Sequence, residues 1–162
     1  MKKIIFTIAF IITALISLNA QTSATASQTV TLILKNTISI DVTSATGTSF
    51  TFDNANDYTN GETNLSASTL EVKSNRPWSV TVNTTTTNFN GPAAPAALMP
   101  ASVLGVRLNG GTAFSSLSTT AAGLTSGGRG VGSFSVDYQA QPGFKYDAGT
   151  YTISVVYTAT QQ

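Results

Sequence analysis

Apolar and polar residues alternate with a period of two along much of this chain, and that pattern limits what it can fold into. It indicates strands with one buried face and one exposed face, which are typical of antiparallel sheets with one side in water. Strands are predicted over 29–34, 38–42, 50–53, 70–73, 78–83, 103–108, 134–139 and 151–158. After the first twenty residues, no stretch shows sustained helical periodicity.

Short motifs rich in Gly, Asn and Pro separate these segments, for example Asn60-Gly61 and Pro142-Gly143. Such residues accept the backbone conformations of tight turns. Short strands joined by turns predict an all-β fold, an immunoglobulin-like antiparallel β-sandwich of about eight or nine strands. Two long connections, 84–101 and 109–132, are expected to be surface loops, the usual place for binding residues on a sandwich.

Composition agrees with a sandwich that has a hydroxyl-rich exterior. The chain holds 27 Thr and 18 Ser, and β-branched threonine favours strands. Hydrophobic residues make up 41% of the chain and charged residues only 9%. That balance supplies a core and argues against disorder.

The chain has no cysteine and no histidine, which removes large classes of chemistry. A Ser-His-Asp triad needs imidazole, a thiol nucleophile needs cysteine, and zinc sites draw mainly on both residues. Disulfides are impossible. With a formal charge of +1 there is no basic excess to neutralise phosphates, so no nucleic-acid partner is expected. We therefore expect a protein that is not an enzyme and that carries no cofactor.

Residues 1–20 are typical of a cleaved secretory signal peptide. Lys2 and Lys3 precede an apolar run over 4–18, and Ala20 offers a small residue for cleavage. The run is shorter than the ~20 residues of a spanning helix, and no second one follows, so no membrane span is expected in the mature chain. Cleavage leaves 21–162 as a single domain with a formal charge of −1, because two lysines leave with the signal. Its destination is the cell surface, the medium or the periplasm.

Three carboxylates lie close together in the segment 53–62: Asp53, Asp57 and Glu62. Oxygen ligands at this density can hold calcium, although Ala55 stands where an EF-hand requires Asp or Asn. Turn-forming Asp and Asn explain the segment more simply, so calcium is a minor expectation. A hydrolase that uses these carboxylates together with Asp137 is the least favoured function.

Aromatic residues are candidates for sugar binding. Trp78 shares its parity with Val80 and Val82, which favours a place in the core over an exposed stacking platform. Tyr58 and Phe114 lie in predicted loops and are the candidate ligand-binding residues.

Three further motifs are weaker. The glycine-rich run 127–132 is followed by a strand pattern rather than a helix, so it predicts a hairpin and not a phosphate cradle. Asp147-Ala148-Gly149-Thr150 matches the aspartic-protease motif only in part and predicts a turn before the last strand. Three lysines are candidates for an isopeptide cross-link to asparagine: Lys35, Lys73 and Lys145.

Several segments resemble known exported proteins. Pro77-Trp78-Ser79-Val80 resembles the first Trp-x-Leu element of WxL-type cell-surface domains, with Val80 in place of leucine. Residues 149–159 are similar to the closing strand of that family, with Tyr157-Thr158-Ala159 where its second Trp-x-Leu stands. The opening 26–32 and the general layout resemble spore-coat-U-like and pilin-like proteins. The resemblance implies a small β-sandwich at the cell surface.

These observations predict a non-catalytic exported structural or adhesion protein, a subunit or accessory of a surface fibre. The alternating segment 29–34 suggests self-association, or association with a surface protein, by strand addition, since it can complete its own sheet or a neighbour's edge. The alternative is a glycan- or cell-wall-binding module.

Overall fold

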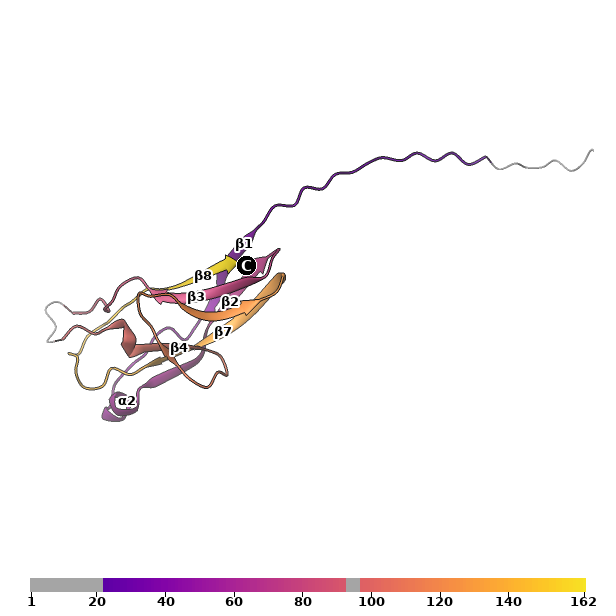
Figure 1. Ribbon diagram of the computed structural model, residues 1–162. Helices are drawn as coiled ribbons and strands as arrows, with labels where there is room; N and C mark the ends of the chain where they lie inside the picture. Colours follow the sequence, from indigo (N-terminus) through magenta and orange to yellow (C-terminus); the bar gives the residue numbers. More distant parts are fainter. Residues whose placement is uncertain (1–21, 93–96) are drawn as a thin grey trace, which may run out of the picture. The chain divides into compact units, whose positions relative to one another are not determined.

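The computed structural model describes residues 22–92 and 97–162 (Figure 1). The predicted signal peptide lies outside the described residues. The chain divides into two units at Leu34, so 22–34 is described separately from Lys35–Gln162. Residues 22–34 are all exposed and form neither helix nor strand. The strand predicted over 29–34 is therefore wrong: its alternation suits a strand, but a strand needs a hydrogen-bonded neighbour.

Lys35–Gln162 forms a sandwich of two antiparallel sheets, which confirms the predicted all-β sandwich. Among the described residues, the strand order is β1-β2-β7-β4-β5 in the larger sheet and β6-β3-β8 in the smaller. The elements are β1 (Ile38–Ala45), α2 (Ala55–Asn60), β2 (Glu62–Ser74), β3 (Trp78–Thr84), the short 3-10 helix η1 (Ala101–Val103), β4 (Leu104–Leu108), β5 (Ser115–Ser116), β6 (Ala122–Gly127), β7 (Gly130–Ala140) and β8 (Val155–Gln161). No helix in 22–92 or 97–162 is long and apolar enough to cross a lipid bilayer.

Most predicted strands are present, with shifted ends, and three predictions need correction. The strand predicted over 50–53 is absent, and Phe50 and Phe52 pack against the core from a connection. The loop predicted over 109–132 contains β5 and β6. The last strand begins at Val155, four residues later than predicted, because the chain before it makes only an isolated bridge at Thr152.

The core lies between the two sheets and follows from the alternation along the strands. On β3 every second side chain is buried, from Trp78 to Thr84. Val82 packs with Leu70 of β2 and Val136 of β7, both fully buried, whereas Trp78 and Val80 pack with Val72 of β2. Burying such a side chain contributes about 1.5–3 kcal/mol, and the two sheets are held together by many of them.

Trp78 is a core residue, as predicted, and is 4% exposed. Its ring lies against Gly127 of β6 and Gly132 of β7, where an added Cβ would come within 2.3 Å and 2.6 Å of the indole. Because β6 and β7 belong to different sheets, the run 127–132 crosses between sheets and does not form the predicted hairpin. Its glycines make room for the indole ring.

Candidate functional site

A groove of about 810 Å³ is the main cavity candidate of the Lys35–Gln162 unit. β1 contributes Val42 and Ala45 to its walls, and β8 contributes Val155 and Tyr157. Among the described residues in its lining, Asp147 is the only charged one. All five tyrosines of the chain line the groove: Tyr58, Tyr138, Tyr146, Tyr151 and Tyr157. Its size and its apolar, aromatic walls are typical of a binding site.

Strand β8 borders this groove and is paired through its backbone on one edge only, while β1 of the other sheet lies beside its second edge. Strand β8 pairs with β3 along its whole length, and no other strand in the described part of the chain pairs with it. Figure 1 shows β8 beside β3. An edge strand of this kind presents unpaired N–H and C=O groups to any chain that approaches it.

The residues just before β8 extend the same open edge. The backbone of Thr152 bonds to Asn90 with N···O distances of 2.8 Å, and the carbonyl of Ser154 accepts from Thr85 N–H at 3.2 Å. Alternate residues of an extended chain direct these groups toward opposite edges. The backbone groups of Ile153 and Val155 therefore face the groove side, away from β3.

Tyr138 and Tyr157 contribute a buried polar contact to the groove. Their hydroxyls are hydrogen-bonded to each other, and they come from β7 and β8, which lie in different sheets. Burial raises the pKa of both phenols, so both stay protonated at neutral pH. The pair thus ties the two sheets together without introducing a charge.

Tyr58, a predicted ligand-binding residue, lines the groove and belongs to an aromatic cluster that extends outside it to Phe144. Its ring stacks on Phe144 with 5.3 Å between centroids and is tilted against Phe52 at 5.4 Å. Phe144 is 69% exposed, so part of the cluster is accessible. Phe144 had no sequence signal as a partner, because the fold brings it to Tyr58 from a distant connection.

Phe114, the second predicted ligand-binding residue, is not in the lining of this groove. Its ring lies 4.2 Å from the guanidinium carbon of Arg107, and its Cβ packs close to Gly105. The ring is half-buried and covers a charged side chain. The structure does not bring Phe114 and Tyr58 together.

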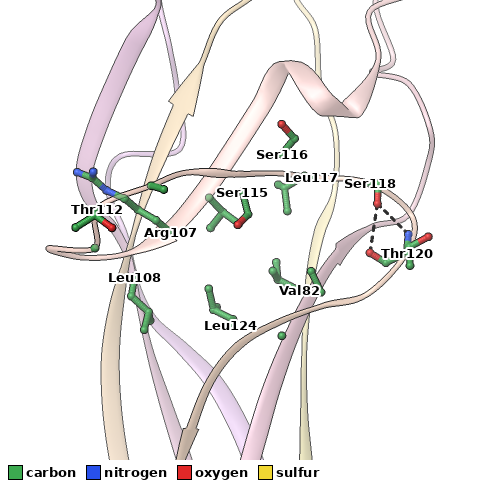
Figure 2. Close-up of a pocket in the computed structure, with 15 residues that line it drawn as sticks. Val82, Arg107, Leu108, Thr112, Ser115, Ser116, Leu117, Ser118, Thr120 and Leu124 are labelled. Carbon is green, nitrogen blue, oxygen red and sulfur yellow. Dashed lines mark hydrogen bonds between the residues drawn. The ribbon is translucent and has the colours of Figure 1, made fainter.

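A smaller pocket of about 240 Å³ lies beside β4 and β6 (Figure 2). Hydroxyl groups line it, and Figure 2 shows Ser118 bonded to Thr120, whose backbone N–H donates to Ser118 Oγ at 3.2 Å. Arg107 is the only charged residue in the described lining, and its Nε donates to Asp137 at 2.9 Å. Because Ser118 and Arg107 already have partners and the cavity is much the smaller of the two, this pocket is the weaker candidate.

Asp137 is a fully buried carboxylate that accepts three hydrogen bonds. The donors are Arg107 Nε at 2.9 Å, Asn109 Nδ2 at 2.8 Å and the Ser66 N–H at 2.9 Å. Burial raises the pKa of Asp137, but the three donors outweigh it and hold the pKa below its ordinary value. Ser66 reaches the carboxylate from a bulge in β2 with a φ of 49°. These bonds connect β2, β4 and β7, which gives Asp137 a structural role.

The acidic segment 53–62 forms a capped helix. Asn54 accepts from the backbone N–H groups of Asn56 and Asp57, and the left-handed φ of 75° at Gly61 ends α2. Desolvation raises the pKa of Asp57, but hydrogen bonds from Asp53 and Asn54 outweigh it and lower the pKa. Asp53 and Asp57 meet around Asn54, whose Nδ2 donates to both carboxylates, but Glu62 does not join them: within the described ranges, no three acidic residues lie close enough to hold a metal ion.

The other motifs take structural places. Asp147 lies in the turns before β8, as predicted, and its carbonyl accepts from the Tyr151 hydroxyl at 2.9 Å. Of the three lysines considered for cross-links, Lys73 forms an ion pair with Glu71 at 2.8 Å.

No protein-family model matches the sequence, and no curated protein matches it. The interpretation of the groove therefore depends on its own geometry.

Proposed function

We propose that this protein is a non-catalytic, exported structural protein of the cell surface that assembles by strand addition. One observation carries the proposal. The same chain holds an open strand edge beside an apolar groove and a strand-like segment that has no strand partner. Exposed edges are normally shortened, charged or covered in proteins that stay monomeric.

The segment 28–34 supplies the donor. Val30, Leu32 and Leu34 are 75%, 82% and 87% exposed. Fully burying each of these side chains is worth about 1.5–3 kcal/mol, so a partner that covers them gains much of that free energy. They alternate with Thr29, Thr31 and Ile33, which places the three side chains on one face of an extended chain and the apolar Ile33 on the other.

The groove supplies a matching acceptor. Residues 151–157, which border it, are as long as the seven-residue donor 28–34. Residues 22–34 contain no charged side chain, so insertion buries no unpaired charge. In this arrangement the donor backbone bonds to Ile153 and Val155, while its apolar face enters the groove. This is β-strand addition, in which the backbone gives affinity and alternate side chains give specificity.

The geometry of one donor and one acceptor in each copy supports a fibre. Each copy offers its segment to the next copy and receives a segment from the previous one. Such head-to-tail contacts produce rings if they close and filaments if they do not. The signal-like residues 1–20 and the absence of cysteine and histidine support an exported, non-catalytic role.

Leu32→Asp in the mature chain is the direct test. We expect the wild-type protein to form oligomers whose size grows with concentration, measured by sedimentation velocity and electron microscopy. The aspartate should weaken association at least about tenfold, which is about 1.4 kcal/mol, because it places a charge in the apolar groove. Thr31→Asp is the matched control on the opposite face and should have a smaller effect. A monomeric wild-type protein, or equal assembly of the Leu32 variant, would contradict the proposal.

The glycan-binding alternative is supported by one observation, the accessible stack of Tyr58 on Phe144. Exposed aromatic rings can stack on sugar faces. This alternative predicts that the mature chain binds a glycan array or peptidoglycan and that the double variant Tyr58→Ala and Phe144→Ala loses the binding. Phe114→Ala, at a ring outside the groove, should keep it. Absence of binding by the wild-type protein would exclude this role.

A further inference from the structure

Two amide side chains hold the backbone of the residues that lead into β1. Asn75 Nδ2 donates to the carbonyl of Lys35 at 2.7 Å, and Asn75 Oδ1 accepts from the Thr37 N–H at 3.0 Å. Gln161 Nε2, at the end of β8, donates to the carbonyl of Thr37 at 2.7 Å and to Asn75 Oδ1 at 3.1 Å. We call Asn75 and Gln161 the exit clamp.

The exit clamp keeps residues 35–37 extended. The Asn75 N–H also donates to the Thr37 carbonyl, at 3.3 Å, which continues the β1–β2 ladder beyond Ile38 and Ser74. The three residues contain neither a turn nor a bend. A tight reversal needs at least about two residues in a turn conformation, and a reversal here would break the bonds of the clamp.

A reversal at 35–37 would also give a poorer pairing direction. Gln161 at the end of β8 bonds to Thr37 just before β1, and Val155 at the start of β8 lines the same groove as Ala45 at the end of β1. The two strands therefore run in opposite directions. A segment that folded back antiparallel to β1 would therefore run parallel to β8. Parallel pairing is slightly less stable per residue than antiparallel pairing. A segment from another molecule has no such restriction and can enter antiparallel to β8.

We propose that the exit clamp directs residues 28–34 into the groove of a second copy of this chain rather than into the groove of their own copy. This inference rests on the proposed function, since it specifies the partner of the strand addition. In this proposal, Asn75 and Gln161 are the residues that favour assembly between copies over insertion of 28–34 into the groove of the same copy. Neither side chain lines the groove, so both act by positioning the backbone.

Two variants test the clamp. The first combines Asn75→Ala with Gln161→Ala. The second inserts four Gly and Ser residues between Leu34 and Lys35, which supplies a turn before an intact clamp. Both should need at least tenfold more protein than the wild type to reach the same oligomer fraction in sedimentation velocity. Their monomers should protect the amides of 28–34 from hydrogen exchange, whereas wild-type monomers should leave them unprotected.

The matched control is the double variant Asn60→Ala and Gln162→Ala, which makes the same chemical changes away from 35–37. It should assemble like the wild type. If the clamp variant does not fold, judged by its thermal transition, the insertion variant carries the test alone. The clamp inference alone is wrong if Leu32→Asp weakens assembly while the folded clamp and insertion variants assemble like the wild type and leave the amides of 28–34 unprotected in their monomers. Both proposals are wrong if Leu32→Asp assembles like the wild type, or if the wild-type protein does not assemble.

Discussion

Replacing Asp137 by alanine is expected to lower the free energy of unfolding of the mature chain by about 3–5 kcal/mol. The carboxylate is fully buried, and its removal leaves Arg107, Asn109 and the Ser66 N–H without their acceptor. Buried donors that lose a partner keep their desolvation penalty. The change can be measured by urea denaturation followed by circular dichroism.

Asp41→Ala is the matched control for this prediction. Asp41 is an exposed acid on β1, so its removal should change stability by no more than about 0.5 kcal/mol. Equal losses for both variants would mean that the network around Asp137 contributes nothing specific to the fold.

The same carboxylate predicts how stability depends on pH. The folded-state pKa of Asp137 lies below its ordinary value, while an unfolded aspartate titrates near about 3.9. The stabilisation is therefore complete above the unfolded pKa and is lost as the pH falls through the folded pKa. Denaturation midpoints from about pH 5 to about pH 2 should fall more steeply for the wild type than for Asp137→Ala. Parallel curves would contradict this origin of the acid sensitivity.

Trp78→Ala is expected to have an effect of similar size, about 3–5 kcal/mol, because it leaves a cavity beside Gly127 and Gly132. Trp78→Phe should cost clearly less. The indole N–H has no hydrogen-bond partner among the described residues, so its loss removes no bond, and the phenyl ring keeps part of the packing. Thermal or urea unfolding distinguishes the two variants.

The glycines beside the indole provide the control. Gly132→Ala should destabilise the wild type by about 1–3 kcal/mol, since its Cβ would overlap the ring. That penalty should largely disappear in the Trp78→Ala background, a coupling that a double-mutant cycle measures. Gly123→Ala, where a Cβ meets nothing within 4 Å, should not couple to Trp78. An additive result for Gly132 would contradict the packing argument.

The sequence predicted the sandwich because its core depends on alternation. Trp78, Val80 and Val82 are the alternate apolar residues of their segment, and they are also the buried residues of β3. The alternation gave a wrong strand prediction where apolar side chains reach the core from a connection. Phe50 and Phe52 alternate, yet they contact the core from a connection, since burial of a side chain does not require a ladder.

Elements without a strong apolar pattern were missed. Residues 122–127 are mostly small, in part because Gly127 must leave room for Trp78, so β6 has little alternation to detect. The six residues of α2 are too few to show helical periodicity, and only its cap at Asn54 marks it in the sequence.

The candidate site was predictable only in fragments. Tyr58 was identified as a loop aromatic, but the meeting of five tyrosines between positions 58 and 157 depends on the register of both sheets. The open edge of β8 is likewise a property of topology, since nothing within a strand's own sequence says which strands flank it. The donor-like pattern of 29–34 was visible in the sequence, whereas its lack of a partner was not.

The placement of the aromatic residues gives the protein two intrinsic optical reporters. Its single tryptophan is buried against two glycines and does not line the groove, while every tyrosine does. Excitation at the red edge, where only indole absorbs, therefore follows the integrity of the core, whereas tyrosine absorbance responds both to unfolding and to changes in the groove. A tyrosine change without an indole change is thus the expected signature of the proposed strand addition, recorded in one unlabelled sample.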